Sequence, residues 1–470
     1  MTEIQAETLK LLEWQRLCQH LSTFAATKLG AIAAQHLVFP QSQADSEILL
    51  AQTVEMQALD GAVDNGVSFE GIGDISDALE RATVGGLIAG KDLLLIATTL
   101  AGVRRLRRLV ENAELELSQL TRLVEQVRTY PELEQDIHHC IDDRGDVTDR
   151  ASPKLEGIRV KIKGAREQIY QTLQRIMQRH SGSIQEAVIT QRGDRFVLPV
   201  KAGQKEQIPG IVHDISSTGS TLYIEPKGIV ELGNRLRQAV KQEEREIEIV
   251  LRQLTEKVAE VVEDLEKLLA IATTLDLAMT RARYSLWLDG HPPKFIAPDQ
   301  PTILRQLRHP LLVWQEKQEE SLEVIPINVQ IRPEIRVVAI TGPNTGGKTV
   351  TLKTLGMAAL MAKVGLFIPA IAPVEIPWFD QVLADIGDEQ SLQQSLSTFS
   401  GHIRRVGRII EALDQESQNN LVLLDEVGAG TDPTEGSALA IALLKYLADQ
   451  TQLTVATTHY GELKALKYED

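Results

Sequence analysis

Between residues 335 and 364 the chain carries a buried-strand pattern, a glycine-rich loop and a helix pattern in immediate succession. The strand pattern is Ile335–Thr341, the loop is Gly342–Thr349 with the sequence GPNTGGKT, and the helix pattern runs from Val350 to about Val364. A strand that feeds a helix through such a loop is typical of an α/β fold, in which helices cover a mostly parallel sheet. The same alternation begins at about residue 301, so we expect an α/β domain there.

The loop matches the Walker A pattern, which predicts a site for ATP and Mg²⁺. Its glycines let backbone N–H groups approach phosphate oxygens, and the N-terminus of the following helix adds a favourable dipole. Lys348 is expected to neutralise the β- and γ-phosphates, and Thr349 is expected to ligate Mg²⁺. The predicted nucleotide-binding residues of the loop are Gly342, Pro343, Asn344, Thr345, Gly346, Gly347, Lys348 and Thr349.

Two later strand patterns end in groups suited to ATP hydrolysis. The run Leu421–Leu424 ends in Asp425 and Glu426, and Asp425 follows Lys348 by 77 residues. Asp425 is predicted to hold Mg²⁺ through water, and Glu426 to be the general base for the attacking water. The next strand pattern ends in His459, which is predicted to reach the γ-phosphate. An apolar run that ends in two acids is weak evidence alone, but its place after a P-loop makes it strong.

Two helix patterns with narrow apolar seams flank a short segment of strand pattern. Residues 153–180 place apolar side chains at three–four spacing, and within 228–287 a seam continues over four heptads from Ile247 to Leu275. An unbroken helix of the second length would be about 90 Å long. The segment between them, 184–226, has strand patterns separated by glycine and proline. We therefore predict an antiparallel coiled coil with a small β element at its tip, in preference to an ordinary helical bundle.

The first helical arm and the β element carry excess positive charge in an acidic chain. The formal net charge is −16, whereas residues 151–180 hold seven basic and two acidic residues. Such a surface neutralises a phosphate backbone, and a solvated helix face is the alternative. A second basic run, at 104–108, is more simply a solvated helix face. The predicted nucleic-acid contacts are Lys161, Lys163, Arg166, Arg192, Arg195, Lys201 and Lys205.

The sequence also argues against a membrane-spanning or a secreted protein. No run of eighteen apolar residues occurs, so we expect no membrane span and no membrane partner. The N-terminus is polar and of mixed charge, unlike a signal peptide. Cys18 and Cys140 are the only cysteines, which is typical of a reducing interior. The expected location is cytoplasmic.

The motifs together resemble the MutS ATPases, a branch of the ABC superfamily. The likeness lies in GPNTGGKT, in LLDEVGAGTD at 423–432 and in TTHY at 457–460, with Arg308–Pro310 and Ser397–Phe399 as further matches. Four segments are similar to the bacterial MutS-two branch of that family: RGDRFVLPVKAGQK (192–205), ISSTGSTLYIEP (215–226), TVTLKTLG (349–356) and GTDPTEGSALA (430–440).

The resemblance implies a homodimer that sandwiches ATP between two ABC-type heads. Ser397 would then approach the nucleotide bound by the other subunit, and Asp432 would lie near the same interface. Members of this branch are associated with splitting stalled, collided ribosomes in the rescue of translation. They are also associated with binding branched DNA and suppressing recombination. The implied substrate is therefore nucleic acid, either ribosomal RNA or DNA, on which ATP turnover moves the arms.

Two departures from the family pattern limit this expectation. No Phe-x-Glu triplet occurs, which argues against mismatch recognition. The chain stops eleven residues after His459, where the family continues into more head structure, a further coiled coil and a small nuclease-type domain. We therefore expect an ATP hydrolase whose head is incomplete at the C-terminus, and no endonuclease activity from this chain.

These patterns and the resemblance together predict a mixed fold. An all-α core at 1–130 is expected to precede long antiparallel coiled-coil lever arms at 131–183 and 227–298. The arms would carry a small β clamp at 184–226, and an α/β P-loop ATPase domain of ABC type would occupy 299–470.

Two other functions stay open at this point. A chromosome-organising ATPase of the SMC type would insert its coiled coil between the two Walker motifs, whereas here the coiled coil precedes the first motif. An ATP-switched DNA clamp would bind ATP without turning it over, and would not need Glu426 as a general base.

Overall fold

The computed structural model describes residues 2–319, 323–342, 347–387, 395–413 and 419–460, with the side chains of 395–399 left out. The chain divides into two compact units. Unit 1 comprises Met1–Glu70, Val103–Val127 and Leu268–Asp470, and unit 2 comprises Gly71–Gly102 and Arg128–Lys267. Helices α6 (Gly90–Glu111) and α11 (Val262–Trp287) belong partly to each unit.

Unit 1 contains a four-stranded parallel sheet whose central strands are buried along their whole length. Its strand order is β10-β11-β12-β8, and the strands are β8 (Val337–Thr341), β10 (Gln381–Asp385), β11 (Asn420–Leu424) and β12 (Leu453–Thr458). All three pairs are parallel. This sheet confirms the α/β architecture that the strand–loop–helix pattern predicts for this part of the chain.

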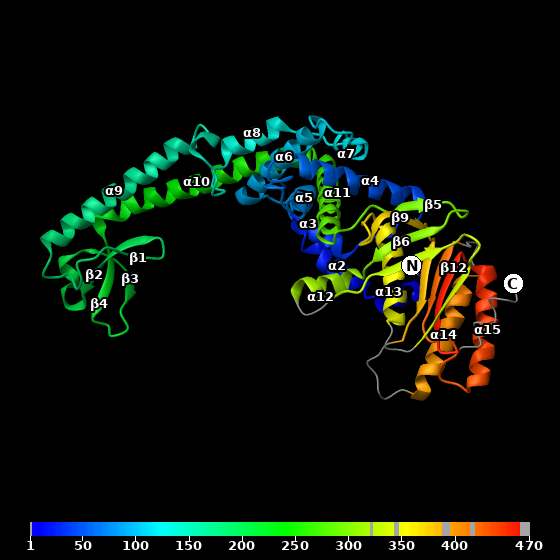
Figure 1. Cartoon of the computed structure of the whole chain (residues 1–470). Helices are drawn as coiled ribbons and strands as arrows, with labels where there is room; N and C mark the ends of the chain where they lie inside the picture. Colours follow the sequence, from blue (N-terminus) through cyan, green and yellow to red (C-terminus); the bar gives the residue numbers. More distant parts are fainter. Residues whose placement is uncertain (1, 320–322, 343–346, 388–394, 414–418, 461–470) are drawn as a thin grey trace. The chain divides into compact units, whose positions relative to one another are not determined.

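Helices cover both faces of this sheet because successive strand residues point to opposite sides. Leu421 and Leu423 belong to the same core cluster as the apolar residues of α13 (Lys348–Lys363). Val422 and Leu424 pack instead with residues of α14 (Ser395–Leu413) and α15 (Pro433–Gln450). Figure 1 shows α14 and α15 together beside the sheet.

A second sheet of unit 1 is mixed and has the order β5-β9-β6-β7. Its strands are β5 (Lys294–Ile296), β6 (Thr302–Leu307), β7 (Ile327–Ile331) and β9 (Ile371–Pro377), and α12 (Pro310–Gln318) follows β6. β5 pairs in parallel with β9, whereas β6 is antiparallel to β7 and β9. β5 thus precedes residue 299, where we placed the start of the ATPase domain, and still pairs with a strand of that region.

The N-terminal helix α1 (Glu3–Leu11) lies against β10, the edge strand of the parallel sheet. Thr2 begins the helix with a capping box to Gln5. The hydroxyl of Thr8 accepts a hydrogen bond from the Ala384 N–H at 2.9 Å, so the helix covers an edge that would otherwise offer unpaired backbone groups. The other N-terminal helices of unit 1 are α2 (Trp14–Ser22), α3 (Lys28–Gln35), α4 (Gln43–Ala62) and α7 (Ser118–Val124).

A buried carboxylate fixes the start of α3 in unit 1. Asp276 accepts hydrogen bonds from the backbone N–H groups of Ala26 and Thr27 at 3.0 and 2.8 Å, and from the Thr27 hydroxyl at 2.6 Å. A Cβ atom at Gly30 would lie 2.0 Å from Asp276 Oδ2. The close approach of helix and carboxylate therefore requires glycine at this position.

Gly30→Ala should lower the free energy of unfolding by about 2–4 kcal/mol, because the new methyl group displaces a buried, hydrogen-bonded carboxylate. Gly61→Ala is the matched control, since Gly61 is also helical and nothing lies within 4 Å of its Cβ position. That control should change stability by no more than about 1 kcal/mol. Chemical denaturation measures both, and equal effects of the two substitutions would contradict the role of Asp276.

Unit 2 consists of helices and one small antiparallel sheet. Its helices, apart from α6 and α11, are α5 (Ser76–Thr83), α8 (Pro131–Cys140), α9 (Leu155–Arg179) and α10 (Lys227–Ala259). The sheet has the order β1-β2-β4-β3, with strands β1 (Thr190–Arg192), β2 (Arg195–Lys201), β3 (Gly210–Ile215) and β4 (Thr221–Pro226). It lies between α9 and α10 in sequence, as the strand patterns at 184–226 predict.

Within unit 2, α9 and α10 run antiparallel and side by side, and the sheet lies at one end of the pair (Figure 1). Arg159 near the start of α9 donates to Glu243 in the middle of α10 at 2.7 Å. One core cluster joins Ile162, Ile169 and Leu173 of α9 to Phe196 and Leu198 of β2. The helix pair and the sheet are thus packed as one body. A role as lever and clamp stays a prediction.

The second arm, 228–287, consists of two helices rather than one. α10 ends at Ala259 and α11 begins at Val262. The Val261 N–H donates to the Val258 carbonyl at 3.1 Å, which tightens the last turn of α10. The adjacent β-branched Val261 and Val262 also lower the local helix propensity. Heptad spacing alone does not reveal this break.

Among the residues that the structure describes, no helix is both long enough and apolar enough to cross a membrane.

Candidate nucleotide site

The P-loop region links β8 to α13 at one edge of the parallel sheet. β8 ends at Thr341 and α13 begins at Lys348, so the expected strand and helix are both present. Gly347 precedes α13 with a φ of +75°, a left-handed conformation that favours glycine. Four predicted phosphate-binding residues, Pro343, Asn344, Thr345 and Gly346, lie outside the described residues.

The first residues of α13 place a cation and a hydroxyl at this edge. The Lys348 ammonium is buried and donates to the Gly342 carbonyl at 2.6 Å. The next residue, Thr349, donates its hydroxyl proton to Oδ2 of Asp425 at 2.7 Å. The structure therefore joins the P-loop directly to the acidic pair, Asp425 and Glu426, although they are far apart in the sequence.

The far end of α13 is anchored by a second set of polar contacts. The Lys363 ammonium donates to the carbonyls of Phe379 and Asp380, both at 2.8 Å, and burial lowers its pKa to about 8. The fully buried Arg281 of α11 donates to Gln52 and Thr53 of α4, and at 3.5 Å to the Val364 carbonyl at the end of α13. Burial lowers the pKa of Arg281 to about 10. Both ends of the helix that carries Lys348 are thus held.

Asp425 is buried at the end of β11 and is fixed from three sides. Its Oδ1 accepts from the Thr457 hydroxyl of β12, and its Oδ2 accepts from Thr349. Its backbone N–H donates to the Asp385 carbonyl at the end of β10 at 2.7 Å. Because parallel strands end at the same edge, residues from β10, β11 and β12 meet here. No sequence pattern indicated a role for Thr457, which precedes His459 by two residues at the end of its strand.

Glu426 has a backbone conformation that is rare for a non-glycine residue, with a φ of +49°. Its N–H donates to the Thr457 hydroxyl at 2.8 Å, which holds the turn. The half-exposed His459 places Nε2 at 3.4 Å from Glu426 Oε1. Such strain at a partly exposed carboxylate is characteristic of functional sites. The structure thus brings together Glu426 and His459, the two predicted catalytic residues.

The two residues expected near the partner subunit lie on the helices that follow this edge. Ser397 is the third residue of α14, and its side chain lies outside the described part of the chain. Asp432 caps α15, where its carboxylate accepts from the Thr434 N–H at 2.9 Å and Pro433 occupies the first turn.

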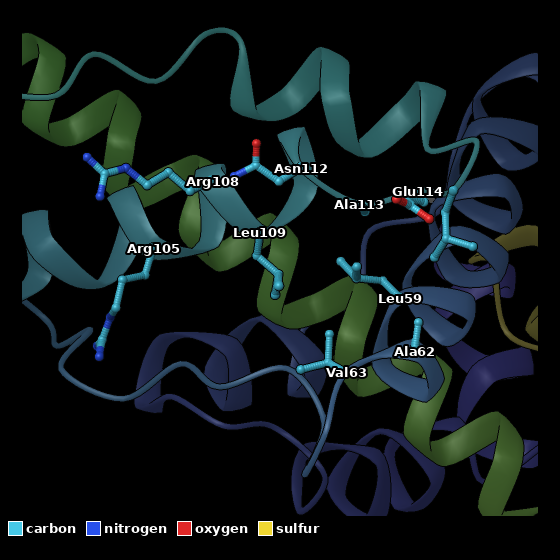
Figure 2. Close-up of a pocket in the computed structure, with 10 residues that line it drawn as sticks. Leu59, Ala62, Val63, Arg105, Arg108, Leu109, Asn112, Ala113 and Glu114 are labelled. Carbon is cyan, nitrogen blue, oxygen red and sulfur yellow. The ribbon is translucent and has the colours of Figure 1, made fainter.

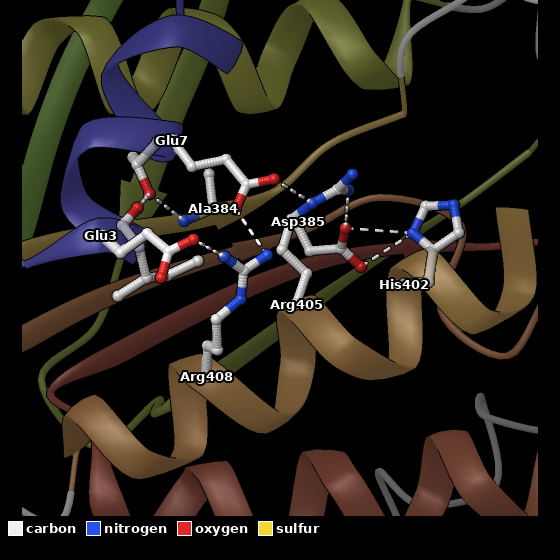
Figure 3. A network of polar contacts seen from close by, with 9 residues as sticks. Glu3, Glu7, Ala384, Asp385, His402, Arg405 and Arg408 are labelled. Carbon is white, nitrogen blue, oxygen red and sulfur yellow. Dashed lines mark hydrogen bonds and ion pairs between the residues drawn. The ribbon is translucent and has the colours of Figure 1, made fainter.

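A polar cluster beside the acidic pair escaped the sequence analysis. Asp385 at the end of β10 accepts from His402 and Arg405 of α14, as Figure 3 shows. The hydrogen bond to Asp385 raises the pKa of His402 above its ordinary value. The useful signal in the sequence would have been Asp385 itself, a carboxylate at the end of a third strand pattern.

This cluster lies at the polar end of an otherwise apolar cavity between α14 and α15. The cavity has a volume of about 360 Å³. Asp385, His402, Asp425 and Glu426 line its polar end, and its apolar lining includes Ile403, Val406, Ile410, Leu439 and Leu443.

The predicted nucleic-acid contacts fall into two groups in unit 2. Lys161, Lys163 and Arg166 of α9 and Lys205 after β2 are exposed. The others have internal partners, although Lys201 is also exposed. Arg195 donates to the buried Glu225 at 3.0 Å, and Lys201 donates to the Gly182 carbonyl at 2.9 Å.

Arg192 also has internal partners, although it is partly exposed. It pairs with Asp214 at 2.9 Å and lies 3.8 Å from the centre of the Tyr223 ring. The exposed group is therefore the stronger candidate surface for a phosphate backbone.

A larger cavity in unit 1, of about 590 Å³, lies against the basic run at 104–108 (Figure 2). Arg105 and Arg108 line it together with Leu59, Val63 and Leu109. Arg105 also donates to the Glu70 carbonyl at 2.5 Å, while Arg107 pairs with Glu111 at 2.7 Å. Part of this basic run is thus used inside the unit, in keeping with its interpretation as an ordinary helix face.

Comparison with known proteins gives matches over nearly the whole chain. The family model described as MutS domain V matches residues 338–470. Endonuclease MutS2 of Synechocystis sp. is 62% identical over 484 residues, covering 99% of this chain and 59% of that protein. Endonuclease MutS2 of Geobacillus thermodenitrificans is 40% identical, covering 99% and 58%, and that of Thermomicrobium roseum is 38% identical, covering 98% and 58%. The chain spans less than two thirds of the length of these curated relatives.

Proposed function

Because this chain belongs to the MutS2 branch of the MutS family, we propose that it binds and hydrolyses ATP with Mg²⁺. One observation carries the proposal: Lys348, Thr349, Asp425, Glu426 and His459 converge at one edge of a parallel sheet. Ligands of such sheets bind beyond the carboxyl ends of the strands, where these residues lie.

Each residue has a chemical task in this proposal. Lys348 neutralises phosphate charge at the N-terminus of α13. The oxygens of Thr349 and Asp425 suit Mg²⁺, which prefers hydroxyl, carboxylate and water ligands. Bound Mg²⁺ would supply further neutralisation of the β- and γ-phosphates. Glu426 accepts the proton of the attacking water, and His459, whose Nε2 lies 3.4 Å from that carboxylate, would reach the γ-phosphate.

The direct test is phosphate release from ATP by the purified chain, with Mg²⁺ and with an excess of EDTA. Turnover that requires Mg²⁺ would support the proposal. Binding of ATP without turnover, at concentrations where the chain is dimeric, would instead favour an ATP-switched clamp.

We further propose that the working unit is a homodimer in which each nucleotide lies between two heads. In this arrangement Ser397, at the start of α14, belongs to the site of the partner subunit, and Asp432 lies near the same interface. Two copies of one surface would then meet about a two-fold axis. Analytical ultracentrifugation with and without a slowly hydrolysed ATP analogue tests this step.

The substrate that we propose is a nucleic acid held by α9, α10 and the small sheet of unit 2. Its phosphates would contact the exposed basic residues Lys161, Lys163, Arg166 and Lys205, and ATP turnover would move the helix pair as a lever. Ribosomal RNA and branched DNA offer the same phosphate chemistry. Co-sedimentation with ribosomes and gel shift on a four-way DNA junction, at the same salt concentration, distinguish the two.

Reversing Lys161, Lys163 and Arg166 to Glu should weaken binding to the preferred nucleic acid by at least tenfold at moderate salt, because three phosphate contacts are lost. The slope of log affinity against log salt should become shallower by about one for each contact. ATP affinity should stay the same.

The matched control reverses Lys10, Lys28 and Lys267 to Glu. These residues are also exposed and lie on three other helices. The control changes the net charge of the chain by the same amount. Equal weakening by both triple variants would point to a general charge effect. Unchanged binding by the first variant would rule out this surface.

A further inference from the structure

Asp385 holds helix α14 against the end of β10 through two side chains (Figure 3). Its buried carboxylate accepts from Nδ1 of His402 at 2.8 and 3.0 Å and from Nη1 of Arg405 at 2.5 Å. His402 and Arg405 are three residues apart, so they project from the same face of the helix. A buried carboxylate is tolerated only with such partners, so its removal should release this face of α14.

The same part of α14 is held from the N-terminal helix. Arg405 also donates to Glu7 of α1 at 2.8 Å. Arg408, one turn further along α14, pairs with Glu3 at 3.1 Å and with Glu7 at 2.8 Å, but not with Asp385. The contacts of Asp385 and those of α1 can therefore be removed separately.

Asp385 links α14 to the acidic pair, Asp425 and Glu426. Through its backbone carbonyl, Asp385 is bonded to the N–H of Asp425, and β10 is in register with β11. Ser397 lies in the first turn of the same helix, five residues before His402, which is roughly 7.5 Å along the helix axis. The side chain of Asp385 thus helps to hold the helix that begins with this turn, whereas its backbone carbonyl holds Asp425.

We propose that Asp385 is a positioning residue that acts on the partner subunit's nucleotide: by holding His402 and Arg405, it orients the first turn of α14 toward that nucleotide. This inference rests on the proposed dimeric ATP hydrolase. The carboxylate takes no part in the chemistry, and the nucleotide bound by its own subunit does not need its side chain.

Asp385→Ala should lower kcat by about tenfold or more, since small displacements of a positioned group are costly. The ATP Kd should stay within about twofold, because Lys348 and Thr349 are untouched. Asp385→Asn, which retains an acceptor for His402, should recover part of the loss. Arg404→Met is the control at an exposed residue of the same helix and should keep nearly the turnover of the unmodified chain. Melting temperatures confirm that each assay uses folded protein.

A mixed dimer decides between action in cis and in trans. Asp385→Ala and Glu426→Gln chains carrying different tags are co-expressed and purified through both tags. One site then combines an intact Glu426 with an intact α14 from the other subunit, and the second site combines both defects. The mixed dimer should therefore recover about half of the unmodified turnover, although each homodimer is nearly inactive.

No recovery in the mixed dimer, or full turnover by the Asp385→Ala homodimer, would overturn the inference. Absence of turnover in the unmodified dimer, or undiminished turnover by the Glu426→Gln homodimer, would instead count against the proposed hydrolase itself. The two failures are therefore distinguishable.

Discussion

Glu426→Gln should reduce the kcat of ATP hydrolysis by about 10²–10³-fold, because a general base contributes an acceleration of that order. Gln has nearly the same shape and meets the same backbone strain at a φ of +49°, so stability should hardly change. It does not accept a proton from water, and its contact with His459 loses the negative charge. The ATP Kd should stay within about threefold, since the phosphate contacts proposed for Lys348 and Thr349 remain.

Single-turnover phosphate release and equilibrium binding of a fluorescent ATP analogue measure the two quantities separately. Glu435→Gln is the matched control, because Glu435 is in the first turn of α15 and bonds only weakly, at 3.3 Å, to Thr431. Undiminished turnover by Glu426→Gln would remove the general base from the proposal. Equal losses of binding and turnover would mean that Glu426 holds the nucleotide.

Lys348→Ala should weaken ATP binding rather than the chemical step alone, and should raise the ATP Kd by about 10²-fold. A charge-assisted hydrogen bond to phosphate is worth about 1.5–3 kcal/mol, and the dipole of α13 alone does not replace it. The ammonium lies at the first position of α13, and the neighbouring Thr349–Asp425 contact does not depend on it. The Mg²⁺ ligands should therefore survive the substitution.

Lys353→Ala tests whether any lysine on α13 would matter as much. Lys353 is on the same helix, but its ammonium lies 3.9 Å from Glu13 rather than at the loop. Its removal should leave ATP affinity nearly unchanged in titration calorimetry. If both variants bound ATP like the unmodified chain, the nucleotide site would have to lie elsewhere.

The sequence predicted the core of the site because each part of it is locally constrained. Gly347 is required by its own backbone conformation, and Lys348 and Thr349 follow it at the start of a helix. Asp425 is placed by the fully apolar strand before it, whose residues are all buried. Such constraints act over a few residues and leave a readable pattern.

The predictions for unit 2 were less complete because net charge does not reveal partners. Counting basic residues grouped Arg195 with Lys161, although the Arg195 side chain is only 13% exposed and serves the buried Glu225. The heptad pattern likewise continued through the break at Glu260 and Val261. Neither the salt bridge of Arg195 nor the break between α10 and α11 is visible in residue counts or heptad spacing.

By itself, the sequence predicted which residues would bear the nucleotide chemistry that we propose, and that an α/β unit presents them. Only the tertiary structure decided that α1 covers β10, and that Glu7 reaches Arg405 from 398 residues away. It also decided that Asp385 holds α14 beside the acidic pair. The physical reason is that backbone conformation and burial are imposed by near neighbours, whereas a contact between distant side chains exists only once the strand order has brought their elements together.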